Sequence, residues 1–140
     1  MSQEKHTIYS VRERNYDKIA YKTHQLTITS EGQSQGFDEL LENKWGKLVA
    51  VKLSSNLPAM AYNRGVFLFE LDNKRIFEEG FEAKNLVSGV HVPHDWSFFE
   101  LQRTLNGGKM IGKYTDTPNP AYPFPAGGYT VSLLLMLEEK

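Results

Sequence analysis

Aromatic side chains are the most abundant candidates for chemistry in this sequence. The 140 residues include seven Tyr, eight Phe and two Trp, which together make up 12% of the chain. Tyr and Trp stack on planar ligands while their polar tips orient them, and clefts lined in this way are the usual binding sites of small molecules. We therefore expect an aromatic-lined ligand site, with ordinary core packing as the alternative for each member. The candidate residues are Tyr21, Phe37, Glu70, Trp96, Phe99, Tyr114 and Tyr122.

Carboxylates are the second group that could do chemistry. Glu70 lies within the apolar segment "FLFEL", so it would supply a buried acid if it pointed inward, and it would face solvent if Phe67 and Phe69 formed the buried side. The other acids are distributed like solvent-exposed and turn residues, and a catalytic pair of carboxylates is not expected from them. No G-x-S-x-G motif and no phosphate-binding glycine loop are present. The sequence thus favours a binding protein over an enzyme, and no residue is assigned a catalytic role.

Histidine and aspartate come together in the segment "HVPHD", residues 91–95. Two imidazoles and one carboxylate can bind a metal ion. However, Pro93 interrupts helical spacing and the remaining histidines, His6 and His24, are distant in sequence. A helix start capped by Asp95 is the simpler interpretation. We expect neither a metal nor a cofactor.

Overall composition excludes several classes of partner. Sixteen basic and seventeen acidic residues give a formal net charge of -1, so no basic surplus exists for direct nucleic-acid binding. The apolar run "VSLLLML" is far shorter than the roughly 20 residues of a membrane-spanning helix, and the polar N-terminus carries no signal core. The chain has no cysteine, which fits a cytoplasmic location.

The hydrophobic pattern predicts alternating strands and helices. Apolar residues recur at steps of three and four over residues 36–48, which favours a helix that buries Trp45 in the core. A second helix is expected over residues 93–105, where Ser97 and Glu100 form a capping box. Strands are expected over residues 7–11 and 17–29, 48–54, 66–71, 109–116 and 129–140, with a weaker strand in residues 75–92. The segments "SNLPAMAYNRG" and "TPNPAYPFPAGG" are expected to be irregular connections.

The two halves of the chain show the same predicted order of elements. Residues of about 7–74 and 75–140 each contain a strand, a helix, a strand, a proline-bearing connection and a strand. This order predicts a single domain over residues 1–140 with an α+β fold. In it, duplicated β-α-β-β units form one mainly antiparallel sheet with two helices on one face, related by a pseudo-two-fold axis.

Several segments resemble the gyrase-inhibitor-like (GyrI-like) family, which includes the effector-binding domains of bacterial multidrug-responsive transcription activators and shares its fold with the SOUL proteins. The similar segments are "YSVRERNYDKIAYKTHQL", "GFDELLENKWGKLVAVKLSSNLP", "GFEAKNLVSGVHV", "HDWSFFELQRTL" and "MIGKYTDTPNP…YTVSLLLMLEE". The resemblance is in order and spacing over nearly the whole chain, and it implies a ligand groove between the helices and the sheet. One position departs from it, because Gly112 stands two residues before Tyr114 where drug-binding members have Glu.

These observations lead to one expected function and two alternatives. The expected function is that of a stand-alone domain that binds or senses a small hydrophobic or aromatic molecule, which is cationic in drug-binding relatives, in an aromatic-lined central groove. Such a domain would serve transcription regulation through a partner. The alternatives are a protein-interaction inhibitor of a gyrase-type enzyme and a small hydrolase that uses a groove carboxylate.

Overall fold

The structure of the protein is a computed structural model, which describes residues 18–87 and 98–140. This part of the chain consists almost entirely of β-strands. The strands are β1 (Ile19–Ile28), β2 (Ser34–Leu40), β3 (Trp45–Ser55), β4 (Gly65–Leu71), β5 (Lys74–Phe77), β6 (Phe99–Thr104), β7 (Lys109–Asp116) and β8 (Tyr129–Glu139). One α-helix, α2 (Pro58–Arg64), and one short 3-10 helix, η2 (Ala83–Asn85), interrupt them.

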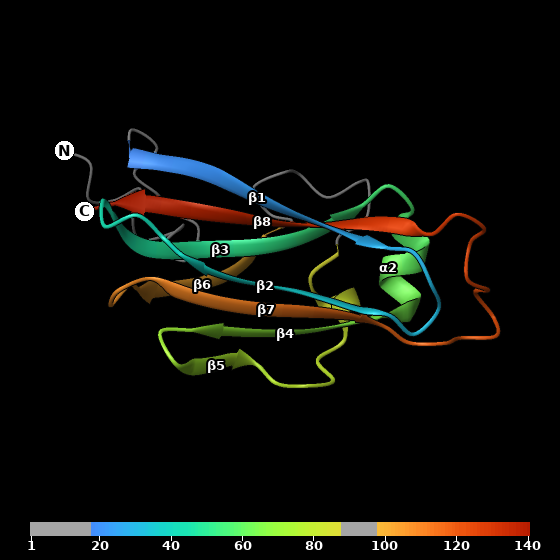
Figure 1. The fold of residues 1–140 in the computed structure, drawn as a ribbon. Helices are drawn as coiled ribbons and strands as arrows, with labels where there is room; N and C mark the ends of the chain where they lie inside the picture. The colour runs from blue at the N-terminus through green and yellow to red at the C-terminus, as the bar shows by residue number, and fades with distance from the viewer. Residues whose placement is uncertain (1–17, 88–97) are drawn as a thin grey trace.

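The strands form two four-stranded antiparallel sheets that pack face to face (Figure 1). Sheet A has the order β1-β8-β3-β6, and sheet B has the order β2-β7-β4-β5. The chain crosses from one sheet to the other at most of its connections, and within the described residues β4 and β5 are the one consecutive pair that stays in the same sheet. Eight strands in this order form a jelly roll. Helix α2 closes one end of the sandwich, as Figure 1 shows.

This architecture corrects the predicted fold class. The chain is not an α+β protein with one sheet and two helices on one face, because two sheets cover each other instead. The predicted helix over residues 36–48 is replaced by parts of β2 and β3. In the predicted helix over residues 93–105, the described residues include strand β6. The helix that does form, α2, lies in the segment that was expected to be irregular.

Polar residues on the inner side of β2 explain the first of these errors. Gln35, Phe37 and Glu39 are more buried than the residues between them, as expected for one face of a strand. Two of these three residues are polar, so the hydrophobic alternation of a strand is hidden in the sequence. Glu39 is tolerated there because it accepts a hydrogen bond from His24 of β1 at 2.8 Å and lies 3.4 Å from Lys22.

Strand positions with a clear apolar pattern were predicted correctly. Phe67, Phe69 and Leu71 alternate inward along β4, so Glu70 points outward. Strand β8 pairs with β1 on one side and β3 on the other, which explains its long apolar run. Of the helices in the described residues, none has the length and hydropathy needed to cross a bilayer.

The space between the two sheets is filled by one hydrophobic core. Sheet A contributes side chains such as Leu48, Val51 and Leu135, and sheet B contributes side chains such as Phe67 and Phe69, all of which are nearly or fully inaccessible to solvent. The central position where the sequence predicted a ligand groove is therefore occupied by packed side chains. A ligand of the described residues must therefore bind outside this core.

Candidate ligand-binding site

The predicted site residues are spread over different parts of the molecule. Tyr21 is 48% exposed on β1, and its ring lies 5.9 Å from that of Phe98. Phe99 on β6 is partly exposed and packs edge-on against Phe77 of β5. Tyr122 is exposed in the connection between β7 and β8. These residues are not brought together in one cavity within the described part of the chain, and Trp96 lies outside it.

The remaining predicted residues have partners inside the protein. Tyr114 is fully buried, and its hydroxyl is hydrogen-bonded to that of Tyr129 at 2.9 Å. Glu70 forms an ion pair with Arg75 at 2.9 Å on the outer side of sheet B, so it is not a groove acid. Phe37 is stacked on the imidazole of His24 with ring centroids 4.5 Å apart.

Gly112 leaves the space that Phe37 occupies. The two residues are directly paired across β2 and β7, and a Cβ atom on Gly112 would overlap the ring of Phe37. A glutamate at this position, as in drug-binding GyrI-like proteins, would therefore collide with the core. The glycine is required by packing, and it provides no opening for a ligand.

Among the described residues, the buried charged side chains, Arg64 and Asp116, lie together at the α2 end of the sandwich. Asp116 at the end of β7 accepts hydrogen bonds from Arg64 Nε and Nη2, both at 2.8 Å, from the Tyr129 hydroxyl at 2.7 Å and from the Gly32 amide at 2.9 Å. Because the Tyr129 proton is directed to Asp116, the Tyr114 hydroxyl must donate to Tyr129.

Burial and hydrogen bonding set the ionisation of this network. Burial opposes the charge of Asp116, but hydrogen bonds from Arg64, Gly32 and Tyr129 outweigh it and lower the pKa of the carboxyl. The hydrogen bond to Asp116 raises the pKa of Arg64. Burial raises the pKa of Tyr114 to about 12. The network is thus a closed ion pair whose donors and acceptors already have partners, and we interpret it as a structural clamp.

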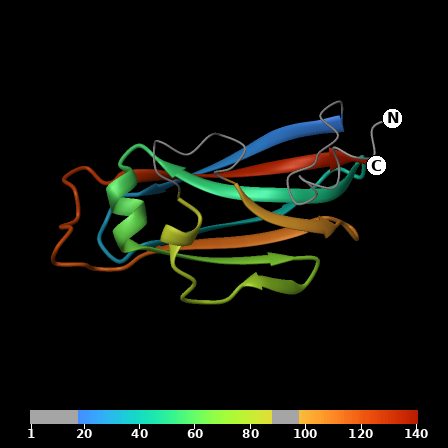
Figure 2. The ribbon, with the colours of Figure 1, turned by 180° about the vertical axis from the view of Figure 1, so that it is seen from behind.

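A cleft between the edge strands β5 and β6 has the properties of a ligand site. It holds about 260 Å³ and is lined by Leu71, Asp72, Lys74, Ile76, Arg103, Thr104 and Asn106. We call it the β5–β6 cleft. Figure 2 shows the end of β6 beside the β4–β5 hairpin, at the end of the sandwich opposite α2. Its volume is slightly below the roughly 300–1,000 Å³ of typical small-molecule sites.

Two strand registers direct cations into this cleft. Arg103 of β6 pairs with Leu48 of β3, which is fully buried, so Arg103 projects on the core-facing side of sheet A. Lys74 of β5 pairs with Leu71 of β4, which is also buried. Across residues 18–87 and 98–140, no ion pair or hydrogen bond engages the side chain of Arg103 or Lys74. Two basic groups therefore share a cleft with the apolar side chains of Leu71 and Ile76.

Asp72 is the acid that lines the same cleft, and its carboxylate is engaged by the backbone. It accepts hydrogen bonds from the amide of Asn106 at 2.7 Å and from the amide of Lys109 at 3.0 Å. These bonds hold the turn between β6 and β7 against the β4–β5 hairpin. Asp72 therefore shapes the cleft without forming an ion pair with either cation.

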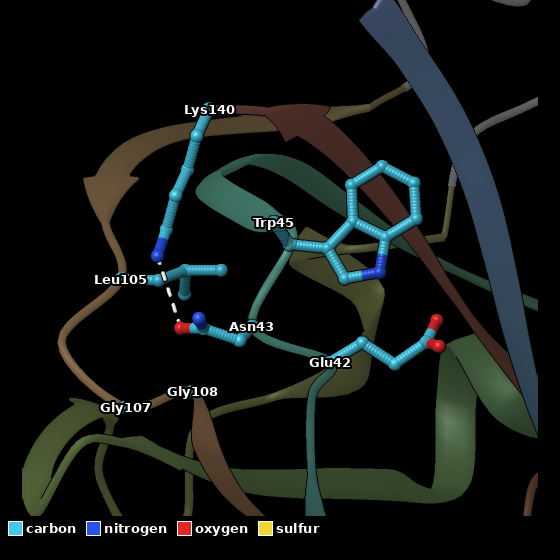
Figure 3. A pocket seen from close by; sticks show the side chains of 7 residues that line it. All are labelled: Glu42, Asn43, Trp45, Leu105, Gly107, Gly108 and Lys140. Atoms are coloured by element: carbon cyan, nitrogen blue, oxygen red, sulfur yellow. Dashed lines mark hydrogen bonds between the residues drawn. The ribbon is translucent and has the colours of Figure 1, made fainter.

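A second depression near the last residue of the chain is too small for a ligand (Figure 3). It has room for about 20 Å³, which corresponds to about one water molecule. Lys140 Nζ donates to Asn43 Oδ1 at 2.9 Å there, and the indole of Trp45 points away from this hydrogen bond. Trp45 is partly buried against the core, as the sequence predicted.

Sequence reasoning did not select Arg103 or Lys74. A signal for Arg103 does exist, because residues 101, 103 and 105 follow the period of a strand and Leu101 and Leu105 pack against the core. An arginine between them on the same side is unusual in such a pattern. Helical spacing hides this signal, because it places Arg103 on the side of Trp96 and Phe99 and separates it from Leu101 and Leu105.

Comparisons with models of protein families, with curated proteins and with solved structures find no match to this chain. The jelly roll alone names no function, because capsid proteins, lectins and cupins share it. The resemblance to the GyrI-like family gains no support from these comparisons. Any functional conclusion must come from the site itself.

Proposed function

We propose that this protein is a small-molecule-binding module whose ligand occupies the β5–β6 cleft. The observation that carries the proposal is the lining of the cleft, where two cations without partners among the described residues lie beside Leu71 and Ile76. A concave site with an apolar wall and a few polar groups is the usual form of a ligand site. We place the protein in the cytoplasm as part of the same proposal, because a chain without cysteine suits a reducing compartment.

The earlier expectations for function are less well supported by the geometry. A central aromatic groove has no space, since the interior is filled by the core. A hydrolase that depends on Glu70 is disfavoured because this carboxylate is paired with Arg75 on the outside of sheet B. A protein partner, such as a gyrase-type enzyme, stays an alternative that would act through the surface and would not need the cleft.

Thermal denaturation with a library of small molecules tests the proposal. A ligand at one hundred times its dissociation constant stabilises the folded protein by about 2.7 kcal/mol, which raises the melting temperature by several degrees. The variant Asn106→Trp places a bulky side chain at the mouth of the cleft and should abolish this rise. Ser30→Trp, in an exposed loop at the opposite end of the sandwich, is the matched control and should respond like the wild type.

Two results would contradict the proposal. One is the absence of a stabilising compound in a library that includes anionic, cationic and neutral aromatic molecules. The other is a compound that stabilises Asn106→Trp as strongly as the wild-type protein, because its site would then lie elsewhere.

A further inference from the structure

We infer that the ligand of the β5–β6 cleft carries an acid group, a carboxylate or a phosphate, which Arg103 and Lys74 bind together. This inference rests on the proposed function and specifies the chemical class of the ligand. Its basis is that these two cations share one cleft and lack the carboxylate partners that most other cations of the described residues have. Carboxylates lie within 4 Å of seven cations in the described segments, namely Lys22, Lys44, Lys47, Arg64, Arg75, Lys84 and Lys113.

The position of Arg103 sets it apart from cations on the outer faces of the sheets. Arg103 is exposed, and exposed cations without partners are common on a protein surface, where water surrounds them. It lies, however, between Leu101 and Leu105 on the core-facing side of an edge strand, and both leucines pack against the core. Arginine at such a position replaces a hydrophobic residue that would close the sandwich. Its guanidinium instead leaves an opening that Lys74 lines from the other sheet.

The charges around the cleft favour an anion. Arg103 and Lys74 contribute two positive charges and Asp72 contributes one negative charge, so the lining has a net charge of about +1. The oxygens of Asp72 already accept two backbone hydrogen bonds. The neighbouring Glu70 and Glu78 are both paired with Arg75 on the outer side of sheet B, and they do not line the cleft.

The side chains and the volume of the β5–β6 cleft limit which acid group and which remaining part a ligand can have. The planar guanidinium of arginine binds carboxylate and phosphate through two parallel hydrogen bonds, and lysine adds a compact point charge. Leu71 and Ile76 provide an apolar wall for the remaining part of the ligand. A volume of about 260 Å³ suits a small molecule with one acid group and a short hydrophobic part. It does not suit a nucleic acid, which would need an extended basic surface.

Three probes of similar size and different charge test the inference: benzoate, phenyl phosphate and benzyl alcohol. Their dissociation constants are measured by chemical-shift titration of the folded protein, which also detects millimolar binding. We expect at least one of the two anions to bind at least tenfold more tightly than benzyl alcohol. The anion with the lower dissociation constant, benzoate or phenyl phosphate, then shows whether the site prefers a carboxylate or a phosphate. Binding should weaken with increasing salt, because screening reduces the attraction between exposed charges.

Charge-removing variants locate the binding site of the anion. Arg103→Gln should weaken anion binding by about ten- to hundredfold, the range that corresponds to the loss of charge-assisted hydrogen bonds. Lys74→Gln should have a smaller effect, and Arg103→Lys should restore only part of the affinity. Lys18→Gln is the matched control, because it removes one cation next to β1, at the opposite edge of sheet A from β6. Far-UV circular dichroism establishes that each variant is folded.

The possible outcomes separate this inference from the proposed function. If benzyl alcohol binds as tightly as both anions and Arg103→Gln changes nothing, the cleft binds ligands but the inferred acid group is wrong. If neither the probes nor the compound library binds, both proposals fail. If Lys18→Gln weakens anion binding as much as Arg103→Gln does, the attraction comes from the overall charge of the protein, and the inferred site is wrong.

Discussion

Replacing Asp116 with asparagine is the most direct test of how this fold is held together. The carboxylate lies at the end of β7 and accepts four hydrogen bonds, two on each oxygen. Oδ1 accepts from Arg64 Nε and the Tyr129 hydroxyl, and Oδ2 accepts from Arg64 Nη2 and the Gly32 amide. Asparagine can retain the first pair of bonds with its amide oxygen. Its NH₂ group then faces two donors, so the second pair is lost.

The expected cost can be worked out from these contacts. A hydrogen bond to a charged group contributes about 1.5–3 kcal/mol, so the loss of two corresponds to roughly 3–6 kcal/mol. An independent guide is the cost of about 3–5 kcal/mol for removing one member of a buried ion pair. The side chain of Arg64 is fully buried, but it keeps Glu31 Oε2 at 3.1 Å and the Tyr122 carbonyl at 2.7 Å. We therefore expect a loss of about 3–4 kcal/mol.

Urea denaturation followed by tryptophan fluorescence and circular dichroism measures this change. A loss of about 3–4 kcal/mol is a large part of the roughly 5–15 kcal/mol typical of a folded domain. The midpoint should fall while the slope of the transition stays constant. In a thermal scan the melting temperature should drop by roughly 10–15 °C. Glu31→Gln is the control, because Glu31 is 54% exposed and its ion pair should contribute at most about 1 kcal/mol.

A double variant shows whether the loss of stability comes from leaving the buried charge of Arg64 unpaired or from losing the attraction between Arg64 and Asp116. Arg64→Met combined with Asp116→Leu removes both charges, and buried ion pairs replaced in this way often retain their stability. The double variant should therefore lose less stability than the sum of the losses in Arg64→Met and Asp116→Leu measured singly. A loss below about 1 kcal/mol in Asp116→Asn, or losses that simply add in the double variant, would refute this account of the network.

Three further predictions follow from the same core. The stabilisation by Asp116 should be complete above its unfolded pKa of about 3.9 and disappear as the pH falls through its lower folded pKa, so the stability gap between wild type and Asp116→Asn should narrow below about pH 4. A gap that is constant between pH 2 and 7 in urea titrations would contradict this. Gly112→Ala should cost about 1–3 kcal/mol because its Cβ overlaps the ring of Phe37, and an unchanged melting temperature would show that the ring moves freely. Tyr129→Phe should cost about 1–3 kcal/mol in urea denaturation, more than Tyr114→Phe, because it leaves the buried hydroxyl of Tyr114 without its acceptor; equal losses would argue against the assigned donor order.

The strands that could be predicted from the sequence are those whose inner side is uniformly apolar. The alternation of Phe67, Phe69 and Leu71 predicts β4, whereas the sequence left the direction of Glu70 open and the structure shows it facing outward. The apolar run from Val131 to Leu137 predicts a strand with neighbours on both edges, and β8 is one. In both cases burial of hydrophobic surface is the dominant force, so the period of the sequence is that of the structure.

The helix α2 could not be predicted from periodicity because it is short and lies among turn-forming residues. Pro58 at its first position is favourable there, since its missing N–H is not needed in the first turn. The proline favours an irregular connection in the sequence, whereas Ala59, Met60 and Ala61 after it favour a helix. This helix matters for stability, because it ends at Arg64 and places the guanidinium of Arg64 beside Asp116.

Polar residues on inner faces account both for the mispredicted strands and for the unpredicted site. Glu39 on β2 and Arg103 on β6 each interrupt a hydrophobic alternation, and each made its strand resemble a helix in the sequence. In the structure, Glu39 and Arg103 differ in whether a residue of opposite charge lies beside them. Glu39 is bound by His24 and Lys22 across the edge of the sandwich, so the charge is compensated within the protein. Arg103 has no such partner among the described residues, and its side chain is exposed to solvent at the mouth of the β5–β6 cleft. A cation that lines a cleft without a partner of its own is available to bind an acid group, and for this reason Arg103 is the better candidate for function.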